Sequence, residues 1–141
     1  MKRTVLLFAT LVFLCVFHVS AEAAERETGL VDWGQTYVEA TGVAVAPNNV
    51  KGAQGRALAR RGAIVDLQRN LLESIGGVQI DSRTTVNDFM AEDRVRSEVH
   101  GLIRGVELLD GKWDGESYTV TGRIRTEGLR VIVEHCRGLS R

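Results

Sequence analysis

Apolar and small residues return at helical steps between positions 47 and 77. The members of one stripe lie three, four or seven positions apart: Ala53, Ala57, Ile64, Leu67, Leu71 and Ile75. This spacing predicts an amphipathic helix of about six turns that packs on a single layer. On its far, solvent-facing side we place four polar residues: Asp66, Arg69, Asn70 and Glu73.

The sequence also predicts where this helix begins and ends, and how side-chain size changes along it. Pro47 followed by Asn48 or Asn49 is a start signal, and Gly76–Gly77 offers a left-handed end. The first half is rich in alanine and glycine, whereas the second half uses Ile and Leu. Small residues let two backbones approach closely and large ones fill volume, so we expect the two halves to pack differently.

Two segments alternate with a period of two, as strands do. Residues 37–46 place small or apolar residues on one face, Val38, Ala40, Gly42, Ala44 and Ala46, and Tyr37, Glu39, Thr41, Val43 and Val45 on the other. The small face matches the alanine half of the helix, so we predict that this strand and the helix pack together. Residues 78–86 alternate through Val78, Ile80, Ser82, Thr84 and Val86 and predict a second strand.

A short second helix is predicted between Glu92 and Arg104, where apolar residues return at helical spacing: Val95, Val99, Leu102 and Ile103. Asp88 or a nearby polar residue would cap it. Near the C-terminus, Leu129, Ile132, Val133 and Cys136 also lie at helical steps. We predict a terminal helix there, with a strand through the Val-Ile-Val run as the alternative.

The segment VELLDGKWDGESYTVTGRIRT predicts a β-hairpin. Asp114–Gly115 suits the two central positions of a type I′ turn. Counted from that turn, Trp113 faces Glu116, Gly111 faces Tyr118, Leu109 faces Val120 and Glu107 faces Gly122. The core face would then hold Leu109, Tyr118, Val120 and Ile124, with Tyr118 lying across Gly111, and the opposite face would hold Thr119, Thr121, Arg123 and Arg125.

The first 23 residues have the pattern of a secretory signal peptide. Lys2 and Arg3 precede an apolar run from Val5 to Val19, shorter than the roughly 20 residues of a membrane span, and small residues predict cleavage after Ala21 or Ala23. Leu14 before Cys15 does not suit a lipoprotein signal, so we expect no lipid anchor. We predict three parts: a leader (1–23), a loose N-terminal arm (24–35) and one domain (36–137).

Charge and cysteine content narrow the function classes. The chain has 18 basic and 18 acidic residues, and the leader removes two basic and one acidic residue, so the mature protein is nearly neutral. No basic excess exists to follow a phosphate backbone, which argues against nucleic-acid binding. Cys136 is the single cysteine after cleavage, and therefore no intramolecular disulfide is expected.

No catalytic or metal-binding pattern is visible. A nucleophile needs a base within reach, and a hydrolytic metal site needs about three protein ligands. After cleavage the histidines are His100 and His135, and neither lies at ligand spacing from Cys136 or from a carboxylate set. The glycines of KGAQGRALARRG do not complete a nucleotide-binding pattern. We expect a protein that is not an enzyme and has no cofactor or metal.

Five segments in order resemble one family: VEATGVAVAP, KGAQGRALARRGAIVDLQRNLLESIGGVQI, TTVNDF, VHGLIRGVELLDGKW and YTVTGRI. They look like the lipoprotein LPP-twenty-like domain, which is similar to parts of flagellar assembly proteins T and P, over residues 36 to 130. The resemblance implies an α+β fold with a long helix on an antiparallel sheet of about three to four strands, no cofactor, and a periplasmic or outer-membrane place. Several members are structural parts or assembly factors of envelope machines, including rings around the flagellar motor. The family provides no catalytic residue to carry over.

Two hypotheses follow. The first is a non-enzymatic, exported envelope module that meets copies of itself or an envelope protein through a sheet edge or through the face bearing Thr119, Thr121, Arg123 and Arg125. The alternative is a periplasmic binding module for a small ligand or cell-wall fragment, held between the sheet and the second helix near Trp33, Tyr37 and His100.

Overall fold

The computed structural model describes residues 32–141; the predicted leader and most of the predicted arm lie outside these residues. Within these residues the fold is α+β, as expected from the sequence, with an antiparallel three-stranded sheet and three α-helices. The elements are β1 (Tyr37–Val45), α2 (Gly52–Gly76), the 3-10 turn η1 (Val86–Phe89), α3 (Asp93–Arg104), β2 (Glu107–Trp113), β3 (Ser117–Arg125) and α4 (Thr126–Leu139).

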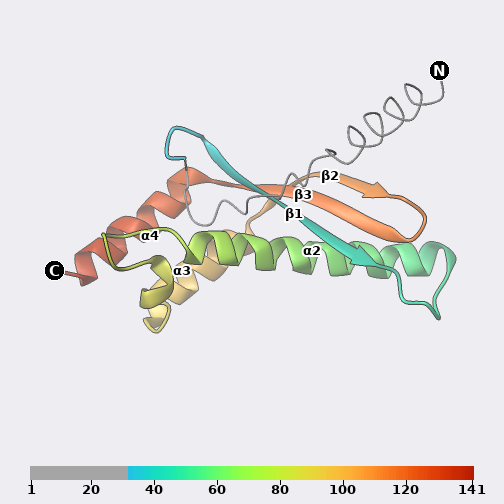
Figure 1. Ribbon diagram of the computed structural model, residues 1–141, viewed down its shortest axis with the longest axis horizontal. Coiled ribbons are helices and arrows are strands. Elements are labelled where there is room, and N and C mark those ends of the chain that lie inside the picture. Colours follow the sequence, from blue (N-terminus) through green and yellow to red (C-terminus); the bar gives the residue numbers. More distant parts are fainter. Residues whose placement is uncertain (1–31) are drawn as a thin grey trace, which may run out of the picture.

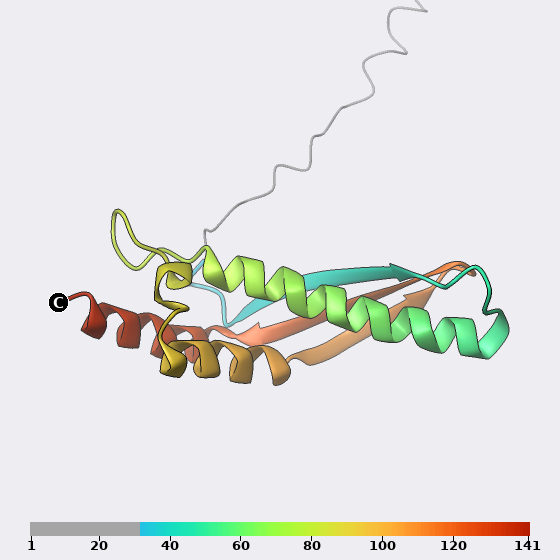
Figure 2. The ribbon, with the colours of Figure 1, turned by 90° about the horizontal axis from the view of Figure 1, so that it is seen from below.

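The sheet has the order β1-β3-β2, and α2 runs along one side of it (Figures 1 and 2). The helices α3 and α4 gather beside the C-terminal end of α2 and extend the core beyond the sheet. Within residues 32–141, no helix combines the length and the apolar character needed to cross a bilayer.

The first half of α2 lies almost backbone to backbone with β1. A Cβ added to Gly42 of β1 would sit 2.1 Å from the Ala63 carbonyl oxygen and 2.2 Å from the Leu67 nitrogen. One at Gly62 of α2 would sit 2.8 Å from the Ala44 Cβ. The predicted pairing of the small strand face with the alanine half of the helix is therefore confirmed.

The buried stripe of α2 was only half predicted. The second half is as expected, with Leu67, Leu71 and Ile75 fully buried. In the first half the buried residues are Gly55, Ala59 and Ala63, whereas Ala53 and Ala57 are exposed and Ile64 is half-buried. The true stripe continues backward from Leu67 in steps of four, and in a segment so rich in small residues the spacing alone does not separate these alternatives.

Both predicted ends of α2 also need correction. Pro47 to Val50 form a turn closed by a Val50 N–H to Pro47 carbonyl bond, and the helix begins at Gly52. At the other end Gly77 is right-handed, with φ −76° and ψ −7°. Its N–H donates to the Glu73 carbonyl, which continues the helical bonding and removes the need for a left-handed residue.

Residues 78–86 are not a strand, although their alternation marked the buried positions Val78, Ile80 and Val86 correctly. The Asp81 carboxylate accepts hydrogen bonds from the Arg83 and Thr84 N–H groups at 2.8 and 3.0 Å, which turns the chain back on itself. One isolated bridge, Gln79 with Thr85, is all the ladder that forms. Asp88 caps η1 through Thr85 and not the second helix, which begins after Glu92 without a side-chain cap.

The two remaining helices agree with the sequence. Helix α3 buries Val95, Val99 and Ile103, and α4 buries the predicted residues Leu129, Ile132, Val133 and Cys136. The strand alternative for the C-terminal segment is therefore wrong. The Ser140 N–H donates to the Cys136 carbonyl of α4, so helical bonding continues slightly beyond the predicted domain end at residue 137.

The hairpin is present, but its turn is one residue later than predicted. Asp114 N–H donates to the Ser117 carbonyl, so Gly115 and Glu116 are the central residues, and Gly115 carries the positive φ of 109°. Glycine adopts a positive φ at little cost because it has no Cβ. Asp114 lies outside the turn centre, and its carboxylate accepts from the Glu116 N–H, the Ser117 N–H and the Ser117 hydroxyl.

This shift changes the strand register. Trp113 pairs with Tyr118, Gly111 with Val120, Leu108 with Gly122 and Glu107 with Arg123. Leu109 falls in a bulge and is 43% exposed, so it is not the core residue that we predicted. Tyr118, Val120 and Ile124 are buried as expected, because alternation along β3 itself sets the face of each of its side chains. Tyr118 still crosses Gly111, since a Cβ there would meet its hydroxyl at 2.6 Å.

Candidate functional site

The side of the sheet away from α2 forms a continuous surface, here called the open face. Cross-strand partners point to the same side, so the register defines its members: Tyr37, Glu39, Thr41, Val43 and Val45 of β1, Ser117, Thr119, Thr121, Arg123 and Arg125 of β3, and Glu107, Asp110 and Lys112 of β2. None of the helices in the described part of the chain packs across it (Figures 1 and 2).

One end of the open face is charged and is organised around Arg123. The Arg123 Nε donates to Glu107 Oε2 at 2.8 Å, and its guanidinium carbon lies 4.0 Å from the centre of the Tyr37 ring. The hydrogen bond and charge of Arg123 lower the pKa of Glu107, and the same bond raises the pKa of Arg123. Arg123 is thus held between two neighbours, whereas Arg125 is exposed.

At the other end of the open face the β1 side is apolar and Lys112 of β2 lies across β3 from it, with hydroxyl groups between the two ends. The Thr41 and Thr121 Oγ1 atoms lie 3.5 Å apart across the strands. Beyond them, Val43 and Val45 of β1 are 48% and 59% exposed. The open face therefore offers solvent both charged groups and exposed apolar side chains of β1.

The free edge of β1 is partly occupied by side chains of α2. Asp66 Oδ2 accepts from the Val43 N–H at 2.9 Å, and Asn70 Nδ2 donates to the Thr41 carbonyl at 2.7 Å. These two residues were placed on the solvent side of the helix, and that prediction is wrong for both, while Arg69 and Glu73 are exposed as expected. Backbone groups already bonded to side chains are poor templates for an added strand.

The free edge of β2 is interrupted in a different way. The bulge at Leu109 breaks the regular ladder. Next to it, the Gly111 N–H, which points away from β3, donates to Asp110 Oδ1 at 2.7 Å. A bulge and a self-bonded donor both discourage strand addition, so the open face is the more available of the two surfaces that the sequence suggested.

The four candidate interaction residues, Thr119, Thr121, Arg123 and Arg125, do lie together on the open face. The sequence also placed the odd-numbered β1 residues on one face but did not join the two sets, because pairing of β1 with β3 is a contact between distant segments. Glu107 was missed as the partner of Arg123, since the predicted register set it opposite Gly122.

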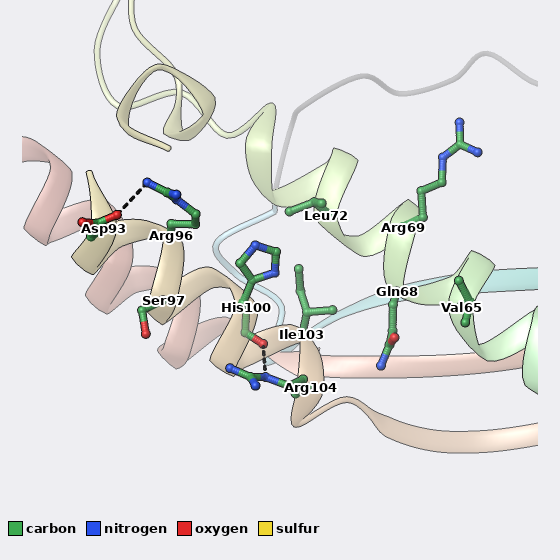
Figure 3. A pocket seen from close by; sticks show the side chains of 10 residues that line it. All are labelled: Val65, Gln68, Arg69, Leu72, Asp93, Arg96, Ser97, His100, Ile103 and Arg104. Atoms are coloured by element: carbon green, nitrogen blue, oxygen red, sulfur yellow. Dashed lines mark hydrogen bonds and ion pairs between the residues drawn. The ribbon is translucent and has the colours of Figure 1, made fainter. Parts of the chain in front are cut away.

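The alternative ligand site is not assembled as predicted. Tyr37 lies on the open face beside Arg123, and Trp33 lies in an exposed turn closed by the Gln35 N–H to Asp32 carbonyl bond. His100 instead lines a groove of about 650 Å³ between α2 and α3 (Figure 3). The groove has an apolar wall from Val65, Leu72 and Ile103, and polar residues that include Arg96 and Arg104.

His135 and Cys136 of α4 lie where the helices pack together. His135 Nδ1 lies 3.1 Å from Glu98 Oε2, which joins α4 to α3, and this hydrogen bond lowers the pKa of Glu98. Cys136 is buried, and its burial raises the pKa of the thiol. In residues 32–141 no group of three or more His, Cys, Asp or Glu side chains is arranged to hold a metal ion.

Comparison of the chain with protein-family models and with curated proteins gives no match. The resemblance to the LPP-twenty-like domain stays a prediction from the quoted segments. Function is therefore inferred from the geometry of the surfaces described above.

Proposed function

We propose that this chain is a non-enzymatic, exported envelope protein that acts as a structural or assembly module, and that copies of it associate through the open face. The open face carries the proposal, because it is a broad surface of a three-stranded sheet with Val43 and Val45 about half exposed. Export and a periplasmic or outer-membrane location rest on the predicted leader, and a flagellar-motor setting rests on the family resemblance.

A second copy is the partner that the charges favour. The open face carries three acidic residues, Glu39, Glu107 and Asp110, and three basic ones, Lys112, Arg123 and Arg125. In a two-fold contact the same patch meets itself, so a patch with both signs is able to set unlike charges opposite each other. An envelope protein of another kind is the other partner expected from the sequence.

The test should spare Arg123, because reversing its charge would place three carboxylates together with Glu39 and Glu107. Val45→Asp and Arg125→Glu change exposed open-face residues and leave the core intact. We expect each to weaken self-association at least about tenfold, since a desolvated charge opposes an apolar or like-charged contact. Sedimentation velocity over a concentration series measures this effect.

Val131→Asp is the matched control for Val45→Asp. Val131 of α4 is 64% exposed and lies outside the open face. It should leave both association and thermal unfolding unchanged. A wild-type protein that stays monomeric at its highest soluble concentration, and that recovers no envelope partner on co-purification, would overturn the assembly proposal.

The second candidate function, a binding module for a small ligand, is favoured by the α2–α3 groove. Its volume of about 650 Å³ lies within the range of about 300 to 1,000 Å³ that small-molecule pockets occupy. Of the residues first expected to form such a site, only His100 belongs to it.

A further inference from the structure

The α2–α3 groove combines an apolar wall with a cation that has no ion-pair partner among residues 32–141. Leu72 and Val65 come from α2 and Ile103 from α3, and Val65 is 65% exposed. Figure 3 shows His100 and Ile103 of α3 reaching toward Leu72 of α2 across the groove. An exposed valine beside a hollow of this size leaves apolar surface uncovered.

The charged residues of the groove differ in how far they are already engaged. Arg96 donates to Asp93 and to the Met90 and Ala91 carbonyls, and Arg69 pairs with Glu73 and points away from α3 (Figure 3). Arg104 forms no ion pair with a described residue. Its Nε donates to the His100 carbonyl at 3.2 Å, and both Nη atoms are left for another acceptor.

We propose that this groove binds a single-chain anionic amphiphile of the fatty-acid type. The alkyl chain lies along Val65, Leu72 and Ile103, and the carboxylate accepts hydrogen bonds from Arg104. A guanidinium with two free nitrogens matches a carboxylate in charge and geometry. The site is separate from the open face, so its occupancy does not depend on self-association.

The experiment uses protein purified after expression of the full chain, titrated calorimetrically with dodecanoate below its micelle concentration. The ring signals of His100 in the NMR spectrum report binding inside the groove. We expect one saturable site, with affinity for acetate and for dodecyltrimethylammonium at least about tenfold weaker, because acetate lacks the chain and the ammonium head has the wrong charge.

Two pairs of variants locate the site. Val65→Asp should weaken dodecanoate binding at least about tenfold, and Val131→Asp, with a valine of similar exposure on α4, should not. Arg104→Gln should weaken binding by a similar factor, whereas Arg130→Gln on α4 should have no effect. Val45→Asp on the open face should also leave binding unchanged, which keeps this test independent of the assembly proposal.

Three results would overturn the inference. One is equal binding of the cationic amphiphile, which would indicate detergent-like adsorption. Another is binding that is unchanged in both Val65→Asp and Arg104→Gln when their thermal unfolding matches that of the wild type. The third is binding to vesicles of phosphatidylglycerol with none to dodecanoate, which would assign the groove to a bilayer surface.

Discussion

The two halves of α2 pack against their neighbours in opposite ways. The first half approaches the sheet so closely that Gly42 and Gly62 have no room for a side-chain atom. The second half buries Leu71 and Ile75 against η1 and α3, where large side chains fill the volume. Added atoms should therefore damage the first half, and removed atoms the second.

Gly42→Ala should disrupt the packing of the first half of α2 on β1, and it should have the largest effect. Its Cβ would overlap backbone atoms of Ala63 and Leu67, and backbone moves aside only if the whole helix shifts. We expect a loss of more than about 3 kcal/mol in the free energy of unfolding, measured by chemical denaturation.

Gly101→Ala is the control, since no atom lies within 4 Å of a Cβ at that position of α3. It should stabilise the protein by up to about 1 kcal/mol through helix propensity. Equal effects of the two alanines would contradict the close approach of α2 and β1.

Leu71→Ala should destabilise the packing of the second half of α2. Leu71 is fully buried, and its truncation should cost roughly 2 to 5 kcal/mol in the free energy of unfolding. Glu73→Ala, on the exposed side of the same turn, should change it by less than about 0.5 kcal/mol. Similar denaturation midpoints for the two variants would show that the faces of α2 are assigned wrongly.

Asp66→Ala tests the hydrogen bond between α2 and the free edge of β1. Loss of the acceptor for the Val43 N–H should cost about 1 kcal/mol and speed hydrogen exchange of that amide. Arg69→Ala, which removes the ion pair with Glu73, should leave Val43 exchange unchanged. If both variants behaved alike, Asp66 would not hold the edge.

A substitution in the hairpin, which is remote from the second half of α2, should have the smallest effect on stability, and that effect should depend on pH. Hydrogen bonds from the Ser117 hydroxyl and from the Ser117 and Glu116 N–H groups lower the pKa of Asp114 from 3.8 to about 2. A lowered folded-state pKa contributes stability above the unfolded value, and this contribution is lost as the pH falls from about 4 through about 2.

Asp114→Asn should therefore be less stable than the wild type above pH about 4, and this difference should shrink as the pH falls to about 2. Thermal unfolding across this range measures it. Glu116→Gln in the same turn is the control, because the Glu116 carboxylate accepts no hydrogen bond from a described residue. A constant difference for Asp114→Asn would rule out the hydrogen bonds as its cause.

The sequence by itself determined the elements and most of their buried faces. Periodicity was enough for β1, α2, α3 and α4, because each buries one side and local spacing records which side that is. The grading of α2 from alanine to leucine even predicted its two packing regimes. The same alternation put Thr119, Thr121, Arg123 and Arg125 on one face of β3.

Only the tertiary structure decided what lies opposite what. Asp66 and Asn70 read as solvent-facing until β1 is placed beside them. Glu107 meets Arg123 because the turn is one residue later than the Asp-Gly pair suggested and because Leu109 bulges out of β2. The segment 78–86 alternates like a strand but folds back, since Asp81 bonds its own chain. The α2–α3 groove likewise joins residues about 30 positions apart. Spacing along a chain encodes the face of one element, whereas register, edges and grooves depend on contacts between elements.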